Sequence, residues 1–442
     1  MHRPSIVMHT QSIRRVRLGL ALGLFVTVVL TGCGSSSTSG GSSGTSKAGG
    51  LTPGTVSLVA LASDQPGLVQ VIKDWEKIHP DVTIQGTYPV SGPNYTAVAT
   101  QFAAGNGADL VWLIAGAASP TSAQTFAKAG YLADLSNESW VPTMYQPTKP
   151  QYSLDGKVYV RDGGLSPLAI MSYNKTYFKA HKLSAPTTFS QLLGMCRTIS
   201  ADGKIPISWG AGLQAVNIND TAVIAGNTVF SHDPNWVDQR IQGKTTFADT
   251  AGWGQALQEI VDMKNAHCFS PGAAGASLNQ MISDFANGQA EMMFTYGGLD
   301  GNVLQLTPNL SIGMFALPAP SAADTRITLQ AAGGFGLNVK SNVKADAKAF
   351  LNFWSTPQEQ KVFANLNNLI SATQAANGNL SGIYTEIQPY FADKKVLTDP
   401  TAKWPNTSFN TNAGASIQGL FTGQKTVPAV QADMDKFFDA KS

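Results

Sequence analysis

The fold class rests on the stretch VSLVALASDQPGLVQVIKDWEKIHP, residues 56–80. Its first six residues form a short apolar run bounded by turn-forming residues, which predicts a buried parallel strand. A helix is expected next, because apolar residues recur at helical spacing. They are Leu68, Val71, Ile72, Trp75 and Ile78. Asp64 is placed to cap this helix, Pro66 fits its first turn, and Pro80 ends it.

The alternation of strands and helices continues along the chain. Residues 82–88 predict a strand, 95–104 a helix and 109–114 an apolar strand, an order that builds a parallel sheet with helices on both faces. Further strands are expected at 205–209, 292–296 and 333–339. Further helices are expected at 189–199, 253–266, 345–354 and 357–366, the last capped by Thr356, and a terminal amphipathic helix follows. We therefore predict an α/β protein.

A secretory signal precedes this body. Arg14, Arg15 and Arg17 flank the apolar segment 18–30, which is too short for a membrane-spanning helix of roughly 20 residues. The sequence LTGC at 30–33 resembles a bacterial lipobox, so residues 1–32 are the predicted lipoprotein signal peptide and Cys33 the predicted lipidation site. Residues 33–51, rich in Ser and Gly, form the predicted flexible tether. We expect an exported protein anchored to the outer face of the cell membrane.

Composition argues against several partners. The formal charge of +2 falls to −2 without residues 1–32, which hold four Arg and no acid. Charged residues make up only 13% of the chain, and no basic stripe is present, so we expect no nucleic-acid partner. The His residues are scattered without metal-ligand spacing, so neither a metal nor another cofactor is expected. A sparsely charged exported protein suits a neutral polar ligand.

Beside Cys33 the chain has Cys196 and Cys268. An even pair in an oxidising compartment predicts a disulfide between them. Two buried free thiols are the alternative, because sequence does not show the distance between the residues.

A series of short motifs is spread along the chain between residue 56 and the end. They are WEKIHP (75–80), GNGADLVW (105–112), GYLADL (130–135), DGKVY (155–159), YNK (173–175), PTTF (186–189), FANGQAEMM (285–293), LP (317–318), GGFG (333–336) and Gly423. In this order and spacing the chain resembles the extracellular solute-binding proteins of ABC importers, family 1, the sugar-binding lipoprotein type.

This resemblance implies the type II periplasmic-binding-protein-like fold, with a ligand cleft between two lobes joined by a hinge. Lobe 1 would comprise residues 52–163 and 334–380, and lobe 2 residues 164–333 and 381–442. The implied function is to bind a small polar solute, most plainly a carbohydrate, to close over it, and to deliver it to the transmembrane permease subunits. We expect a monomer without chemistry of its own.

The same resemblance implies the ligand-binding residues, all near predicted strand ends or lobe crossings. They are Asp64, Gln65, Arg161, Asp162, Trp209, Tyr296, Gly297, Gly334, Phe335, Phe409 and Asn410. Structural roles are the alternatives, with Asp64 as a helix cap, the Arg161–Asp162 pair as a structural ion pair and Trp209 in the core; Trp112 is expected in the core. Gly298-Leu299 stands where relatives carry a Trp that stacks on sugar, which leaves Tyr296 to supply the aromatic platform.

Other functions stay open from sequence alone. A polyol, a peptide or a charged small molecule could replace the sugar. An anchored surface hydrolase is disfavoured, because no H-E-x-x-H, P-loop or nucleophile elbow in a strand–helix context is present. A surface sensor that works without a transporter is the third possibility.

Overall fold

The structure of the chain is a computed structural model that describes residues 54–89, 93–117, 119–295, 298–404 and 407–440. The predicted signal peptide, the tether and the lipidation site Cys33 lie outside the described residues, and so do Tyr296 and Gly297. Within the described part, no helix is both long and apolar enough to cross a membrane.

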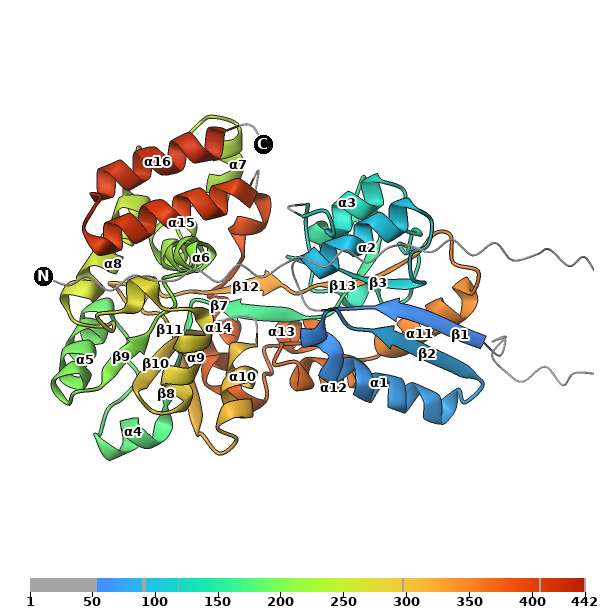
Figure 1. The fold of residues 1–442 in the computed structure, drawn as a ribbon, viewed down its shortest axis with the longest axis horizontal. Helices are drawn as coiled ribbons and strands as arrows, with labels where there is room; N and C mark the ends of the chain where they lie inside the picture. Colours follow the sequence, from blue (N-terminus) through green and yellow to red (C-terminus); the bar gives the residue numbers. More distant parts are fainter. Residues whose placement is uncertain (1–53, 90–92, 118, 296–297, 405–406, 441–442) are drawn as a thin grey trace, which may run out of the picture. The chain divides into compact units, whose positions relative to one another are not determined.

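The first sheet has the predicted parallel start. Strands β1 (Gly54–Val59), β2 (Val82–Thr87) and β3 (Leu110–Leu113) pair in parallel with β1 in the middle. Two strands from later in the chain, β13 (Gly334–Leu337) and β6 (Val160–Asp162), complete the order β2-β1-β3-β13-β6 and run antiparallel to their neighbours. The predicted βαβαβ unit is thus confirmed (Figure 1).

Helix α1 (Gln65–Ile78) matches its prediction except at the cap. Trp75 is buried at 1% exposure, and its indole Nε1 donates to the carbonyl of Val82 at 3.1 Å. Asp64 precedes the helix but its side chain makes no capping hydrogen bond, because a 3₁₀ turn (η1, Ala62–Asp64) leads into α1 and holds Asp64 in right-handed helical geometry. The predicted capping role of Asp64 is therefore wrong, whereas Thr356 does cap α12 (Pro357–Leu366).

Helices cover the first sheet and enclose an aromatic core. They are α1, α2 (Pro93–Ala103), α3 (Ala123–Lys128), α11 (Lys344–Trp354) and α12. Trp112, Phe335, Trp354 and Phe363 contact one another through ring pairs 5.1–6.0 Å apart. The expectation that Trp112 is a core residue is confirmed. Short elements on this side are η2 (Val141–Thr143), η3 (Lys149–Tyr152), β4 (Ser153–Leu154) and β5 (Lys157–Val158).

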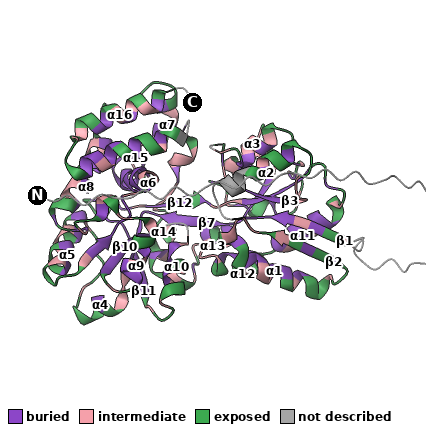
Figure 2. Cartoon of the chain, viewed as in Figure 1, coloured by how far each residue is buried: buried purple, intermediate pink, exposed green. Residues whose placement is uncertain are grey.

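The second sheet has the order β11-β8-β10-β9 and its own core. Its strands are β8 (Ile170–Asn174), β9 (Ile205–Ser208), β10 (Ala290–Thr295) and β11 (Ile312–Ala316). The helices of this part are α4 (Lys175–Ala180), α5 (Phe189–Ala201), α6 (Gln214–Ala225), α7 (Trp236–Ile241), α8 (Ala251–Asn265), α9 (Leu278–Ala286), α10 (Leu299–Leu306), α15 (Thr407–Thr422) and α16 (Val427–Asp439), with a short 3₁₀ turn η5 (Ala273–Gly275). Figure 2 shows strands that are largely buried and helices with exposed outer faces.

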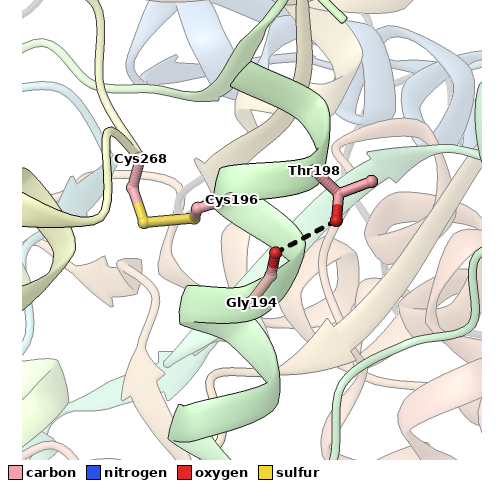
Figure 3. The surroundings of a disulfide bond; sticks show 4 residues. All are labelled: Gly194, Cys196, Thr198 and Cys268. Carbon is pink, nitrogen blue, oxygen red and sulfur yellow. Dashed lines mark hydrogen bonds between the residues drawn. A yellow bond between two sulfur atoms is a disulfide. The ribbon is translucent and has the colours of Figure 1, made fainter. Parts of the chain in front are cut away.

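A disulfide joins Cys196 on α5 to Cys268, which follows α8 (Figure 3). The two Cα atoms are 4.8 Å apart, and both side chains are fully buried. The bond closes a loop with a sequence separation of 72 residues. The bond therefore links helix α5 covalently to the segment that follows α8, as the even pair of cysteines predicted.

A third, smaller sheet lies where the chain passes from one large sheet to the other (Figure 1). Its order is β14-β12-β7, with β7 (Leu165–Leu168), β12 (Ile327–Ala331) and β14 (Val396–Thr398). Strand β7 follows β6 of the first sheet and precedes β8 of the second, and β12 lies between β11 and β13. Around it lie α13 (Ala372–Asn377), η6 (Gly382–Ile387), α14 (Gln388–Ala392) and η7 (Pro400–Lys403).

Helices α6 and α15 pack closely against each other, and the sequence did not predict this contact. A Cβ built on Gly414 of α15 would lie 1.9 Å from the carbonyl oxygen of Gln214, so only glycine allows this crossing. Helix α6 continues into a π-helix, η4 (Gly226–Phe230). Its Asn227 donates to the carbonyl of Leu317 at 2.9 Å and accepts from the backbone N–H of Arg326 at 2.8 Å, which fixes the segment between β11 and β12.

Candidate functional site

The first predicted ligand residues lie in the loop after β1. Gln65 is exposed, whereas Asp64 is 8% exposed and its Oδ2 has no hydrogen-bond partner among the described residues. Burial raises the pKa of Asp64 to about 7, although the backbone of Leu61 opposes this. Asn367 holds the loop, because its side chain donates to the carbonyl of Asp64 at 3.3 Å and accepts from the N–H of Gly67 at 3.0 Å.

Four predicted residues meet as paired neighbours on β6 and β13, where Arg161 lies opposite Phe335 and Asp162 opposite Gly334. Arg161 and Asp162 are 2% and 0% exposed and form an ion pair. Arg161 Nε also donates to Ser355 Oγ at 3.1 Å, and burial lowers the pKa of Arg161 to about 9. Phe335 is 0% exposed. All four residues are therefore buried in the part of the chain that is built on the first sheet.

Trp209 lies directly after β9 and is 3% exposed. Its ring packs between Phe269 and Phe421, and its Nε1 donates to Asp220 Oδ2 at 2.6 Å. At the start of α15, Phe409 is 0% exposed and packs against Phe247. The next residue, Asn410, has a buried Oδ1 without a hydrogen-bond partner in the described part of the chain.

A cavity of about 590 Å³ lies between segments attached to the two large sheets. On the side of the first sheet it is lined by Gly116, Ala117, Gln124, Pro147, Pro150 and Gln151. On the other side it is lined by Pro234, Val237, Thr398, Asp399, Pro400, Ala402, Lys403 and Trp404. We call this space the inter-lobe cavity. None of the predicted ligand residues that the structure describes lines it.

The two walls of the inter-lobe cavity approach each other at Gly116. This residue, in the loop after β3, has a φ of +81°, and a Cβ built on it would lie 3.4 Å from the carbonyl oxygen of Ala402. On the opposite wall, Lys403 forms an ion pair with Asp238 at 2.6 Å. The loop after a strand of the first sheet therefore meets the 3₁₀ turn η7.

The model of the family described as bacterial extracellular solute-binding protein matches residues 61–361, more than half of the chain. The chain belongs to this family. Its fold is the two-lobed one of solute-binding proteins rather than that of an enzyme.

Curated relatives and solved structures agree with the assignment. This solute-binding protein is 22% identical over 356 residues to the multiple sugar-binding protein of Streptococcus mutans, with 78% of this chain and 79% of the relative covered. It is 23% identical to the melibiose/raffinose/stachyose-binding protein MelE of Bacillus subtilis, over 60% of this chain and 62% of that protein. The structure of RafE in complex with raffinose has a TM-score of 0.70 at 18% identity, over 87% of this chain and 98% of that one.

A small recess of about 40 Å³ shares Asp399 and Pro400 with the inter-lobe cavity. Its other lining residues come from β7, α6, β12 and η7. They are Leu168, Asn219, Asp220, Ala222, Val223, Thr328, Gln330 and Thr401. Trp209, which the sequence analysis placed in the site, does not line this recess, but its indole donates a hydrogen bond to Asp220, which does.

Sequence reasoning missed both Asp220 and Asp399. Asp220 is a single acid within the otherwise uncharged helix QAVNINDTAVIA, and it is 2% exposed. An acid in so apolar a helix is a signal that could have marked it, because burying a carboxylate is costly without a partner. Asp399 precedes Pro400 and accepts hydrogen bonds from Thr401 and, at 3.1 Å, from Gln330 Nε2.

The pKa of Asp220 predicts how stability of the solute-binding protein depends on pH. Burial raises this pKa from 3.8 to about 7, against the hydrogen bond from Trp209. The folded state then keeps a proton that the unfolded chain loses near pH 3.8, so the free energy of unfolding falls as pH rises from about 4 to about 7. In urea unfolding, Asp220→Asn should gain stability relative to the natural chain across that range. Asp249→Asn, which replaces an exposed acid, is the control, and its free energy of unfolding should depend on pH as that of the natural chain does. The same pH dependence in Asp220→Asn as in the natural chain would contradict the prediction.

Proposed function

We propose that this protein is the substrate-binding component of an ABC importer and that it captures a carbohydrate, most simply an oligosaccharide, in the inter-lobe cavity. The cavity carries the proposal, since its volume of about 590 Å³ lies in the usual range for small-molecule sites, roughly 300–1,000 Å³. The relatives, a multiple sugar-binding protein and a melibiose/raffinose/stachyose-binding protein, support a sugar over a peptide or a charged solute.

The two walls of the cavity give the proposed mechanism. A ligand that touches both walls binds the closed arrangement better than an open one and shifts the population towards it. Gly116 and Ala402 mark the place where the walls meet. Strands β7 and β12, which connect the two large sheets, would carry the hinge, and the lobes would divide at the residues predicted above.

Further parts of the proposal rest on the sequence. A lipid on Cys33 would hold a monomer at the outer face of the cell membrane, and the closed protein would deliver its ligand to the permease subunits. The exposed Gln65, and Asp64 beside it, stay proposed ligand contacts. Arg161, Asp162, Trp209, Gly334, Phe335 and Phe409 are buried inside the individual lobes, so we do not propose them as direct contacts of the ligand.

Thermal unfolding of the purified full-length chain with a panel of sugars, polyols, amino acids and peptides tests the proposal. A ligand that binds only the folded state stabilises it by about 2.7 kcal/mol at a concentration of one hundred times Kd. We expect a rise of the midpoint with a few related oligosaccharides. A rise with peptides alone would replace the sugar by another solute, and no rise with any compound would refute the proposal.

A matched pair of glycine variants places the binding in the inter-lobe cavity. Gly116→Leu puts a side chain between the walls and should weaken sugar binding at least tenfold. Gly130→Leu is the control, because Gly130 has a similar φ of +74° but no atom within 4 Å of a built Cβ. Equal loss of binding in both variants would show that backbone strain, and not blockage of the cavity, is responsible.

A further inference from the structure

The recess beside the inter-lobe cavity holds polar groups that the fold leaves without partners. Asp220 receives one side-chain hydrogen bond, from Trp209 to Oδ2, and no described residue donates to its Oδ1. Thr328 is 3% exposed, yet its hydroxyl has no hydrogen bond to a described residue. Because buried polar groups are normally satisfied, these atoms indicate a bound group that the recess accommodates.

The charge of the recess is one-sided. Asp220 and Asp399 both line it, and no described lining residue is basic. The nearest lysine on the cavity wall, Lys403, is paired with Asp238. Desolvation destabilises the charged form of two enclosed carboxylates that have no cation beside them, which is why burial raises the pKa of each. A cationic ligand group would offset this destabilisation and keep Asp220 ionised.

The size of the recess limits what enters. About 40 Å³ accommodates one small polar group and not a sugar ring. The adjoining cavity of about 590 Å³ has room for one or more rings. The shared lining residues Asp399 and Pro400 make the two spaces neighbours, so a substituent on a ring in the cavity can reach the recess.

We propose that the recess binds the protonated amino group of an amino sugar whose ring occupies the inter-lobe cavity. The ammonium donates to Asp220 Oδ1 and to the Thr328 hydroxyl, and the charge of the two carboxylates balances it. This inference rests on the proposed function and narrows its ligand class. A hydroxyl in the same place would offer one donor and no charge, so it would leave the carboxylates less well compensated.

Calorimetric titration of the purified full-length chain tests the inference with three matched series near pH 7.5. These are oligomers of glucosamine, of N-acetylglucosamine and of glucose, each from one to four units. We expect the glucosamine oligomer of the best length to bind at least tenfold tighter than its N-acetylated and neutral counterparts. Neutral sugars that bind as well as the amine series would overturn the inference and leave the proposed function standing. Absence of binding by every sugar would overturn both.

Asp220→Asn identifies the residue responsible. The asparagine oxygen can still accept from Trp209, while its NH₂ group faces the ammonium and repels it. We expect at least a tenfold loss of affinity for the amino sugar and less than a threefold change for a neutral sugar. Glu259→Gln is the control, because Glu259 is also buried, at 5% exposure, but lies outside the recess. Unchanged amine binding in folded Asp220→Asn would overturn the assignment.

Discussion

Replacing Phe335 by alanine is expected to lower the free energy of unfolding by about 3–5 kcal/mol, the range for deleting a buried aromatic ring. The side chain is 0% exposed. Its ring lies 5.1 Å from that of Trp112 and 5.2 Å from that of Trp354, edge to face in both pairs. The substitution therefore opens a cavity in the centre of the first core. Urea unfolding followed by tryptophan fluorescence measures the loss.

The same variant separates two roles for Phe335. The resemblance to sugar-binding lipoproteins implied a ligand contact, whereas the structure encloses the ring. We expect sugar affinity, measured well below the unfolding midpoint, to change less than threefold. Leu366→Ala is the control for stability, because Leu366 is 47% exposed and should cost less than about 1 kcal/mol. Natural stability with lost sugar binding would show that Phe335 contacts the ligand.

Removing the disulfide with the double variant Cys196→Ala, Cys268→Ala should lower the free energy of unfolding by about 4 kcal/mol. The bond closes a loop of 72 residues, and the chain-entropy model gives this size for such a loop. Both side chains are fully buried, so alanine also leaves small cavities and the loss should not fall below that figure. Guanidinium unfolding of the natural chain and the variant measures it.

Cys33 supplies the control for this experiment, because it is the only other cysteine of the chain. Cys33→Ala should leave stability unchanged, and the denatured, unreduced variant should contain no free thiol. Two free thiols in that variant would show that Cys196 and Cys268 are not bonded in solution. Equal stability of the double variant and the natural chain would show that the bond does not stabilise the fold.

The first sheet was predictable because its pattern is local. The apolar run at β1, the helical spacing of Leu68 and Trp75, and the apolar run of β3 each indicate their structure within a few residues. The start of α1 was not predictable in the same way. A 3₁₀ turn brings Asp64 into helical geometry, and the loop is held by Asn367, some 300 residues later. Long-range contacts of this kind leave no local periodicity.

The site was harder to predict for the same reason. Family resemblance pointed to Arg161 and Asp162, but the pairing of β6 with β13 encloses both. Asp220 and Asp399 are 179 residues apart and share the recess only because α6 and the segment after β14 both pack at the third sheet. Trp209 was placed near the site by sequence, and the structure adds its hydrogen bond to Asp220. Charge in an apolar helix was the one available local signal.

The place of β13 also sets the order in which the protein can fold after synthesis. Strand β3 ends at Leu113, yet its antiparallel neighbour begins at Gly334, more than 200 residues later. A nascent chain that has emerged only as far as the second sheet has an unpaired strand edge in its first sheet, and such contacts between distant residues slow folding. A chain cut short before residue 334 should therefore aggregate. An unfinished first sheet also suits a polypeptide that crosses a membrane before it folds.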